Sequence, residues 1–380
     1  MKRRAILRSL AAFVYARLNP ILIQPCYNRQ HHQRHTSIAA ATSLVNRPSA
    51  KLSEERNIMI EQLHPKRFLA LALTLLLASC ATGLSTSNLL PARGTAQSNA
   101  AALPPFKHIF VIVMENKEYD QLIDSPSAPY LNTLAQHYGL ATNYYGIRNP
   151  SLPNYLALTG GSTFGITSNC TDCTIAQPNL IDQLETAGKS WKAYIESMPS
   201  PCYIGDAPPL YRQKHNPFIY YDNVRNNPAR CNKIVPFTQF ALDAKANALP
   251  NYVWITPNMC NNSHDCSIAD SDAWLQIWVS AILSTPEWKD NGVLFITYDE
   301  GDSKKIFRTS CCKEGNGGHI VTLVISPLSK PGYQSPIGYD HYSLLRTIED
   351  AWGLPELGGA ACDCAPPMGD FFVANTPARR

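Results

Sequence analysis

Runs of consecutive apolar residues, many of them β-branched, recur along the chain from residue 108 onward. The first run, His-Ile-Phe-Val-Ile-Val-Met, has the unbroken apolar character of a strand that is buried on both faces of a sheet. Similar runs follow at intervals that leave room for a helix between them. We expect strands at 108–114, 140–145, 190–195, 251–256, 293–298 and 320–326.

The segments between these runs show the spacing of apolar residues that is typical of helices. Helices are expected at 128–138, 179–187, 237–248, 271–283 and 341–352, the last one ended by Gly353 and Pro355. Alternating strands and helices predict an α/β fold with a predominantly parallel central sheet and helices on both faces. The expected domain spans 106–375, and its segment 197–236 is interpreted as a loop-rich insertion over the active face, held by Cys202 and Cys231.

The amino-terminal third has a different character. Residues 59–80 are interpreted as an export signal with a basic start, an apolar stretch too short to span a bilayer, and an end, Leu77-Ala78-Ser79-Cys80, that resembles the bacterial lipobox. This predicts a protein exported to the periplasm or cell surface and bound to the membrane through a lipid on Cys80; the alternative is a plain signal peptide. Residues 1–58 are interpreted as a mis-called or non-structural extension, and 81–105 as a flexible tether.

Composition adds limits to this picture. The formal net charge is +4, with much of the basic excess near the start of the chain, so nothing favours a nucleic-acid partner.

Without Cys26 and Cys80, ten of the twelve cysteines remain, and an even number in an exported chain predicts disulfides. A zinc site at Cys170 and Cys173 is the alternative, but it lacks a second cysteine pair at metal-finger spacing.

The stretch Asn-Pro-Ser-Leu-Pro-Asn-Tyr at 149–155 is the first candidate for chemistry. Ser151 follows a predicted strand and precedes a short predicted helix, whose first turn tolerates Pro153. Free N–H groups and the positive dipole end at a helix start favour an anion such as phosphate, which the amide of Asn154 can also reach. The alternative is an ordinary serine N-cap.

Oxygen-bearing side chains follow three predicted strands: Glu115-Asn116, Asn258 and Asp299-Glu300. The carboxyl ends of parallel strands meet at one edge of a sheet, where such folds bind ligands. Carboxylates and amide oxygens suit a hard divalent cation, with Mg²⁺, Ca²⁺, Mn²⁺ or Zn²⁺ possible. Ser151 is expected to join these residues as a ligand of the cation, which makes its hydroxyl a better nucleophile. The alternative interpretation is a set of solvated loops.

Three histidines are candidates for a second metal, for phosphate binding or for protonating a leaving group: His264, next to Asp265, His319 and His341. His264 and His319 are the stronger candidates, because one precedes a carboxylate and the other follows a glycine-rich approach. Each can also be a surface or capping residue. His108, His137 and His215 are interpreted as structural or exposed.

Together these motifs resemble the bacterial phosphoesterase family, which holds acid phosphatases and non-haemolytic-type phospholipases C and belongs to the alkaline phosphatase superfamily. The matching residues are 113–117, 150–155, 257–258 with 264–265, 298–300 and 339–350. The resemblance implies that Glu115, Asn116, Asp299 and Glu300 hold a metal and that Ser151 is the nucleophile. It matches His264-Asp265 and His319 to the later histidine segments of the superfamily. Two positions depart from the family pattern: Asn149, where the family often has His or Thr, and Asn258, where distant members have a metal-binding aspartate.

We therefore expect an exported metal-dependent phosphoric ester hydrolase, in which Ser151 attacks and His264 or His319 protonates the leaving oxygen. Asn154, Asp265 and His341 are expected on the phosphate. An acid-phosphatase-like monoesterase is favoured over a phospholipase C, for which an apolar lip with tyrosines 203, 211, 220 and 221 would be needed. A non-catalytic surface lipoprotein remains the alternative from another class. A sulfatase is disfavoured, since Tyr155 stands where its motif has arginine.

Overall fold

The computed structural model describes residues 103–301 and 316–373. The export signal with Cys80, the extension before it, the tether up to residue 102, and Cys311 and Cys312 lie outside the described residues, and so these predictions stay open. No helix in the described part of the chain is both long enough and apolar enough to cross a bilayer.

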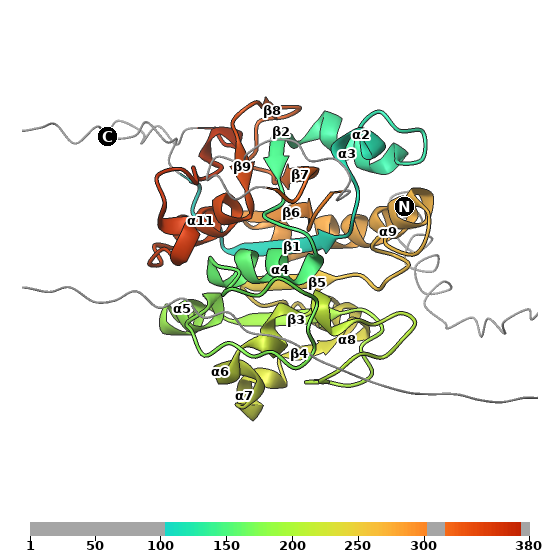
Figure 1. Ribbon diagram of the computed structural model, residues 1–380. Helices are drawn as coiled ribbons and strands as arrows, with labels where there is room; N and C mark the ends of the chain where they lie inside the picture. The colour runs from blue at the N-terminus through green and yellow to red at the C-terminus, as the bar shows by residue number, and fades with distance from the viewer. Residues whose placement is uncertain (1–102, 302–315, 374–380) are drawn as a thin grey trace, which may run out of the picture. The chain divides into compact units, whose positions relative to one another are not determined.

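One mixed sheet forms the centre of the described part, as Figure 1 shows. In sheet order its strands are β4 (Ile234–Pro236), β3 (Trp191–Ile195), β5 (Tyr252–Thr256), β1 (His108–Met114), β6 (Gly292–Tyr298), β7 (His319–Ile325), β2 (Gly139–Tyr145) and β8 (Gln334–Ser335), while β9 (Tyr339–Asp340) also pairs with β2. Every pairing is parallel except the two that β7 makes with β6 and β2. The predicted α/β architecture is confirmed, with one reversed strand that the sequence pattern did not indicate.

Helices cover the sheet. They are α2 (Tyr119–Leu122), α3 (Pro129–His137), α4 (Ser151–Gly160), α5 (Leu180–Thr186), α6 (Asp222–Arg225), α7 (Pro228–Cys231), α8 (Thr238–Lys245), α9 (Ile268–Ser284), α10 (Pro286–Lys289) and α11 (His341–Trp352), with 3-10 turns η1 (Gln213–His215), η2 (Pro217–Tyr220), η3 (Gly358–Ala361) and η4 (Gly369–Phe371). α4 and α11 pack against each other, and α3 and α9 form a second contacting pair. The predicted helices all form, with ends displaced by a few residues.

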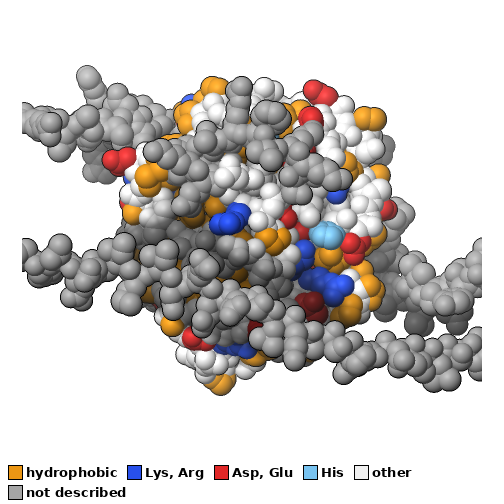
Figure 2. Space-filling view, viewed as in Figure 1, with side chains coloured by type: hydrophobic (Ala, Val, Ile, Leu, Met, Phe, Trp, Pro, Cys, Tyr) orange, Lys and Arg blue, Asp and Glu red, His pale blue; other side chains and the backbone are white. Residues whose placement is uncertain are grey.

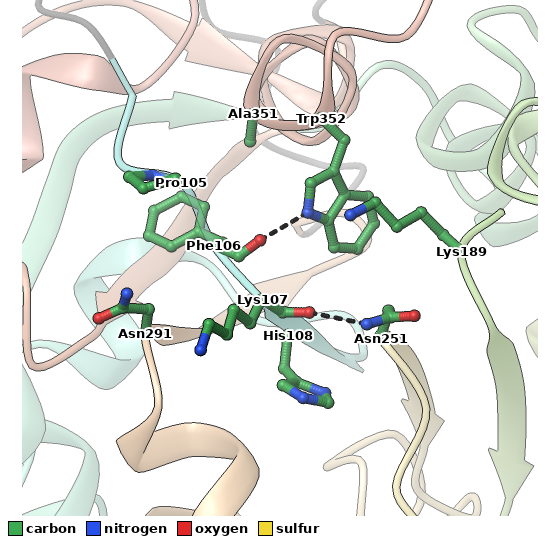
Figure 3. Close-up of a pocket in the computed structure, with 9 residues that line it drawn as sticks. All are labelled: Pro105, Phe106, Lys107, His108, Lys189, Asn251, Asn291, Ala351 and Trp352. Carbon is green, nitrogen blue, oxygen red and sulfur yellow. Dashed lines mark hydrogen bonds between the residues drawn. The ribbon is translucent and has the colours of Figure 1, made fainter. Parts of the chain in front are cut away.

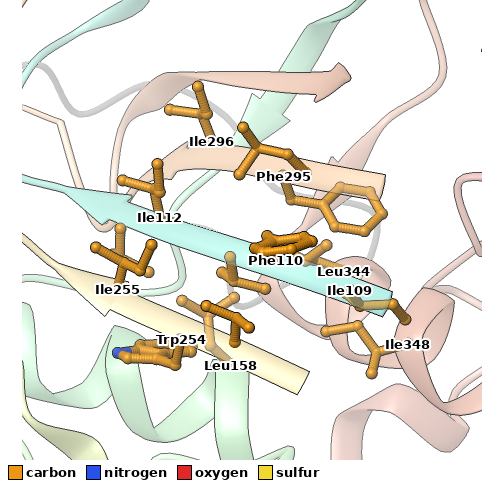
Figure 4. Packing of buried hydrophobic residues seen from close by; sticks show 14 of the residues in the cluster. Ile109, Phe110, Ile112, Leu158, Trp254, Ile255, Phe295, Ile296, Leu344 and Ile348 are labelled. Atoms are coloured by element: carbon orange, nitrogen blue, oxygen red, sulfur yellow. The ribbon is translucent and has the colours of Figure 1, made fainter. Parts of the chain in front are cut away.

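The core lies between the central strands and α4 and α11. Figure 4 shows Leu158 of α4 and Leu344 and Ile348 of α11 facing the side chains of Phe110 and Trp254 on the sheet. Strand β1 is apolar on both faces because it lies in the middle of the sheet, between β5 and β6. This burial fixes the strands from which the polar edge residues project.

Disulfides join eight of the ten cysteines considered above: Cys170–Cys173, Cys202–Cys231, Cys260–Cys266 and Cys362–Cys364. The predicted bond across the 197–236 insertion is therefore confirmed. Cys170 and Cys173 bind each other, which removes the thiolates that the zinc alternative requires. The insertion itself is mostly short turns, from η1 to β4, as its composition predicted.

Candidate active site

The carboxyl ends of β1 and β6 bring together the acidic residues that follow them. Met114 and Tyr298 are paired in register, so Glu115 and Asp299 leave the sheet at the same level. The backbone N–H of Asn116 donates to Asp299 Oδ1 over 3.2 Å. Both carboxylates are completely buried, and the next residue, Glu300, is nearly so. The predicted meeting of these residues at one sheet edge is therefore present.

Ser151 joins them from the start of α4, which follows β2 through a short turn. Its Oγ lies 3.2 Å from Glu115 Oε2 and 3.3 Å from Glu300 Oε1. The residue in the N-cap position is Pro150, and Ser151 is the first helical residue, so the alternative of an ordinary serine cap is wrong. Pro153 falls in the first turn, where a backbone N–H has no intrahelical acceptor, which explains why the helix tolerates it.

Two residues that sequence reasoning missed also reach this cluster from η1. Lys214 Nζ donates to Ser151 Oγ over 3.2 Å and lies 3.9 Å from Glu115 Oε2. His215 Nε2 lies 2.6 Å from Glu115 Oε1, and its ring stacks on Tyr155, whose hydroxyl donates to the same oxygen over 3.1 Å. Of the two alternatives for His215, exposed and structural, the first is wrong, because His215 is buried beside the candidate nucleophile.

The insertion holds this pair firmly. Gln213, which precedes Lys214, donates from Nε2 to the carbonyl of Thr171 and accepts at Oε1 from the N–H of Gly205. No periodic pattern marks these residues in the sequence, because they lie in a turn within a loop-rich segment. The one local signal is a Lys-His pair that Asn216 separates from the apolar stretch of η2.

Burial and mutual repulsion dominate the electrostatics of the cluster. Burial, with the charges of Glu115 and Glu300 beside it, raises the pKa of Asp299 well above its usual range. Burial and Glu115 raise the pKa of Glu300 to about 8. Burial opposes ionisation of Glu115 as well, but His215 and Lys214 outweigh it and hold the Glu115 pKa below its ordinary value. The positive charge of Lys214 and His215 therefore favours ionisation of Glu115 but is too small to keep all three carboxyl groups ionised.

The donor set fits a hard divalent cation by its chemistry. Asp299 Oδ2 and Asn116 Oδ1 are buried, and neither has a hydrogen-bond partner among the residues described here. Such unpartnered buried oxygens are costly unless a ligand satisfies them. Within 103–301 and 316–373, no three His, Cys, Asp or Glu side chains are arranged to hold a metal ion by themselves.

Asparagine side chains support the cluster from outside. Asn149 Nδ2 donates to Glu300 Oε2 over 2.7 Å. Asn154, expected on the phosphate, is fully buried and accepts at Oδ1 from the N–H groups of Ile147 and Arg148 over 2.8 and 3.0 Å, while its Nδ2 donates to the carbonyl of Arg148. All these bonds are to the turn before Ser151, so the polar atoms of Asn154 hold that turn and are not available to a phosphate.

His264 lies at the rim of the site, in a loop closed by the Cys260–Cys266 disulfide. Its Nδ1 is 2.7 Å from Asp265 Oδ1, and its ring centroid is 6.4 Å from that of His215. Its Nε2 has no hydrogen bond to any residue in the described part of the chain. Asp265 therefore orients His264, and the expectation that Asp265 contacts phosphate directly is not supported by this arrangement.

The other two candidate histidines are held by protein groups. His341 is buried between Asp299 O, 2.6 Å from its Nε2, and Tyr144 OH, 3.2 Å from its Nδ1, and burial lowers its pKa to about 4. His319 stacks between Tyr119 and Tyr145, with Nε2 3.0 Å from the carbonyl of Thr142. Because a carbonyl only accepts, both Nε2 atoms carry a proton that is already donated.

Two further sequence expectations place residues at the site that lie elsewhere. Asn258 Oδ1 accepts from the N–H groups of Cys260 and Asn261, and its Nδ2 donates to Ser197, so it shapes its own loop and is not part of the carboxylate cluster. Tyr211, Tyr220 and Tyr221 are buried packing residues, and Tyr203 is only partly exposed.

On the surface, Figure 2 shows basic, acidic and histidine side chains gathered on the viewer's face, beside hydrophobic ones. A separate open depression lies at the opposite, amino-terminal edge of the sheet, where Lys107, His108, Asn251 and Asn291 line it (Figure 3). It contains none of the residues that contact Ser151.

The chain is similar to a known protein family and to proteins of known activity. A sequence model of the Phosphoesterase family matches residues 123–355. The chain is 33% identical over 277 residues to a phosphatidylinositol-3-phosphatase of Mycobacterium tuberculosis, with 72% of this chain and 85% of that protein covered. A probable acid phosphatase of Kluyveromyces lactis is 34% identical over 272 residues, covering 67% of this chain and 60% of that protein.

Two further matches have lower sequence identity. A hemolytic phospholipase C of Pseudomonas aeruginosa is 26% identical over 284 residues, covering 60% of this chain and 39% of that protein. Among solved structures, an alkaline phosphatase superfamily protein from Vibrio parahaemolyticus has a TM-score of 0.45 at 12% identity, covering 68% of this chain and 69% of that chain. The family match spans more than half of the chain, and so the chain belongs to the Phosphoesterase family and, with it, to the phosphoric ester hydrolases, as its motifs predicted.

Proposed function

We propose that the protein is an exported, metal-dependent phosphomonoesterase in which Ser151 is the nucleophile. The observation that carries the proposal is the environment of Ser151 Oγ, which lies within 3.3 Å of Glu115, Glu300 and Lys214. A hydroxyl between carboxylates that accept its proton and an ammonium that stabilises its negative charge is prepared to attack phosphorus. Neither helix capping nor packing by a serine requires two carboxylates and an ammonium group around its hydroxyl.

Each protein group has a part in the reaction. The bond between Ser151 Oγ and phosphorus forms as the bond from phosphorus to the leaving oxygen breaks, and the serine proton passes to a neighbouring carboxylate. His264, oriented by Asp265, protonates the leaving oxygen through its free Nε2. Water then releases phosphate from the phosphoseryl enzyme. The free ring nitrogen favours His264 over His319 for this role.

A divalent cation held by Glu115, Asn116, Asp299 and Glu300 would supply charge that stabilises the Ser151 alkoxide and the phosphate oxygens. Lys214 places a second positive charge directly at Ser151 Oγ. Its reach also covers oxygens of a phosphoryl group bound to Ser151. A doubly charged monoester gains most from two cationic centres, which supports a monoesterase over a phosphodiesterase.

The similarity to a phosphatidylinositol-3-phosphatase and a probable acid phosphatase supports the same choice. A phospholipase C activity is the second candidate, supported by the more distant match. The tyrosines expected to hold a choline head group are largely buried, which gives that candidate no structural support. Export, with a lipid on Cys80, is part of the proposal and is checked by metabolic lipid labelling of Cys80→Ser against the native chain.

The central test compares Ser151→Ala with Ser127→Ala, an exposed serine ahead of α3, as a matched control. Hydrolysis of p-nitrophenyl phosphate and bis(p-nitrophenyl) phosphate is measured with added Mg²⁺, Ca²⁺, Mn²⁺ or Zn²⁺ and with a chelator. We expect faster monoester hydrolysis by the native chain, its loss with chelator and with Ser151→Ala, and no change with Ser127→Ala. Full activity of a folded Ser151→Ala variant would refute the nucleophile, and full activity after chelation would refute the metal.

A further inference from the structure

The carboxyl end of strand β3 carries a glutamate that the proposed chemistry does not use. Ile195, the last residue of β3, pairs in register with Thr256 of β5, and the N–H of Glu196 donates to the carbonyl of Thr256 over 2.9 Å. Glu196 therefore leaves the sheet beside the loop that follows β5. We call this loop, residues 258–266, the His264 loop.

The carboxylate of Glu196 binds both the start of the His264 loop and the helix after it. Its Oε2 accepts from the N–H of Asn258 over 2.9 Å, and Asn261 Nδ2 lies 3.0 Å from each of its two oxygens. Trp274 Nε1, on α9, donates to Oε1 over 3.2 Å. Every one of these groups is a donor, and an ionised carboxylate only accepts, so it satisfies them all. Burial raises the pKa of Glu196, and the three partners oppose that rise.

The His264 loop connects this attachment to the candidate active site. Asn262 Oδ1 accepts from the N–H of His264 over 2.8 Å, and the carbonyl of Asn262 accepts from the N–H of Glu115 over 2.9 Å. Glu115 in turn contacts Ser151. Within the described residues, the one hydrogen bond of the His264 side chain is to Asp265, in the same loop. The distance from the His264 ring to Ser151 therefore depends on how the loop is held.

We propose that Glu196 is a positioning residue, whose carboxylate holds the His264 loop so that Nε2 of His264 reaches the leaving oxygen of the substrate. The inference rests on the proposed function, in which His264 protonates that oxygen. A shift of about 1 Å in a catalytic group lowers a rate by up to about 100-fold. In Glu196→Gln an amide NH₂ replaces one accepting oxygen and faces the donors of the loop, so the loop has to move.

The experiment separates protonation of the leaving group from the other steps. p-Nitrophenyl phosphate releases a stable phenolate that needs no proton, whereas glycerol 2-phosphate releases an alkoxide that does. The kcat/KM on both esters is measured in the presence of Mg²⁺, Ca²⁺, Mn²⁺ or Zn²⁺ for the native full chain and for Glu196→Gln, Asn261→Ala, His264→Ala and Glu287→Gln. Asn261→Ala removes one donor of the loop and leaves the carboxylate in place. Glu287 serves as the control, because it is a buried glutamate on α10, which supplies no residue to the loop or to the site.

We expect His264→Ala to lose about 100-fold in kcat/KM on glycerol 2-phosphate and about threefold or less on p-nitrophenyl phosphate, because only the first ester needs the acid. Glu196→Gln should lose about tenfold and Asn261→Ala about threefold on glycerol 2-phosphate, with both within about twofold of the native chain on p-nitrophenyl phosphate. Glu287→Gln should match the native chain on both esters. The ratio of the two kcat/KM values does not depend on the fraction of folded protein, so partial unfolding cannot imitate the result.

The inference is overturned if Glu196→Gln and Asn261→Ala leave the ratio of the two kcat/KM values unchanged while His264→Ala shifts it. An unchanged ratio in His264→Ala refutes the proposed role of His264, and with it the inference. A native chain that hydrolyses neither ester refutes the proposed phosphomonoesterase function itself and the inference with it.

Discussion

Both the amino edge and the carboxyl edge of the central sheet carry polar residues, but their charged groups have opposite surroundings. At the amino edge, Lys107 and Asp290 form an ion pair of 2.9 Å with both side chains more than half exposed. Asn251 donates to the carbonyl of Lys107, and His108 Nδ1 lies 2.9 Å from the carbonyl of Pro250 (Figure 3). Each of these charged or polar groups has a partner or water.

At the carboxyl edge, the same fold buries Glu115, Asp299 and Glu300 side by side and leaves Asp299 Oδ2 without a partner in the described residues. Water cannot relieve this repulsion, so the pKa values move far from their ordinary range. Stability alone gives no reason to keep such an arrangement. The contrast teaches that unsatisfied buried charge, and not the presence of polar residues, distinguishes the functional edge.

The largest expected effect comes from changing this imbalance at its centre. Asp299→Asn keeps the shape and the acceptor for the N–H of Asn116 but removes one of the three buried carboxyl groups. We expect hydrolysis of p-nitrophenyl phosphate to fall about 1000-fold, because a proposed metal ligand is lost. In chelator, the Tm should rise by about 2–4 °C through relief of repulsion.

The matched change at the other edge is Asp290→Asn, which breaks only an exposed ion pair. It should leave activity intact and alter the free energy of unfolding by less than about 1 kcal/mol. Equal effects of the two substitutions on activity would remove the distinction between the edges.

A smaller effect is expected from Lys214→Met, which deletes the cation at Ser151 Oγ. We expect kcat to fall about 100-fold, the cost of removing a group that stabilises developing charge. Lys214→Arg should recover part of the lost kcat. The control substitution Lys107→Met, at the amino edge of the sheet, should leave kcat unchanged. Steady-state kinetics decide the point: a rise in KM with unchanged kcat would assign Lys214 to substrate binding only.

The smallest effect concerns a buried carboxyl outside both edges. Glu349 on α11 accepts from the N–H of Leu357 and lies near the carboxylates of Glu356 and Asp350, and burial raises its pKa to about 8. Between its ordinary pKa of 4.5 and about 8, the folded chain keeps a proton that the unfolded chain releases, so stability falls as pH rises through this window.

Glu349→Gln cannot titrate. Its Tm advantage over the native chain should therefore grow by about 2–4 °C between pH 5 and pH 8, measured by thermal unfolding. A Tm difference that stays constant across this range would show that the pKa of Glu349 is not raised in the folded chain. Of the carboxyl groups discussed, only those at the carboxyl edge of the sheet would then have a raised pKa.

Much of the fold is predictable from the chain because its strands are continuous apolar runs and its helices are bounded by recognisable signals. Helix α11, for example, begins after Asp340, whose side chain caps it, and ends where Gly353 adopts a φ of 63°. The reversal of β7 and its place between β6 and β2 were not predictable, since its apolar pattern is the same for either direction. Pairing direction depends on long-range packing that no local pattern records.

The site divides in a similar way. Glu115, Ser151, Asp299 and Glu300 were found because they follow strands that meet at one edge. Lys214 and His215 were missed because their approach depends on how a loop-rich insertion folds back, which tertiary contacts decide. Asn154 and His341 were assigned to phosphate because their types suit it, whereas the structure commits their polar atoms to the protein.

The hydrogen bonds of Asn154 have a consequence for the position of Ser151 at the start of α4. They join the first turn of α4 to the chain ahead of it through a neutral amide, at a fully buried position. Neutral buried bonds are insensitive to ionic strength and to acidity. The backbone at the start of α4 is thereby held by contacts that do not depend on the charge state of the carboxylates, and so substitutions that retune the acidic groups for a new working pH need not move it.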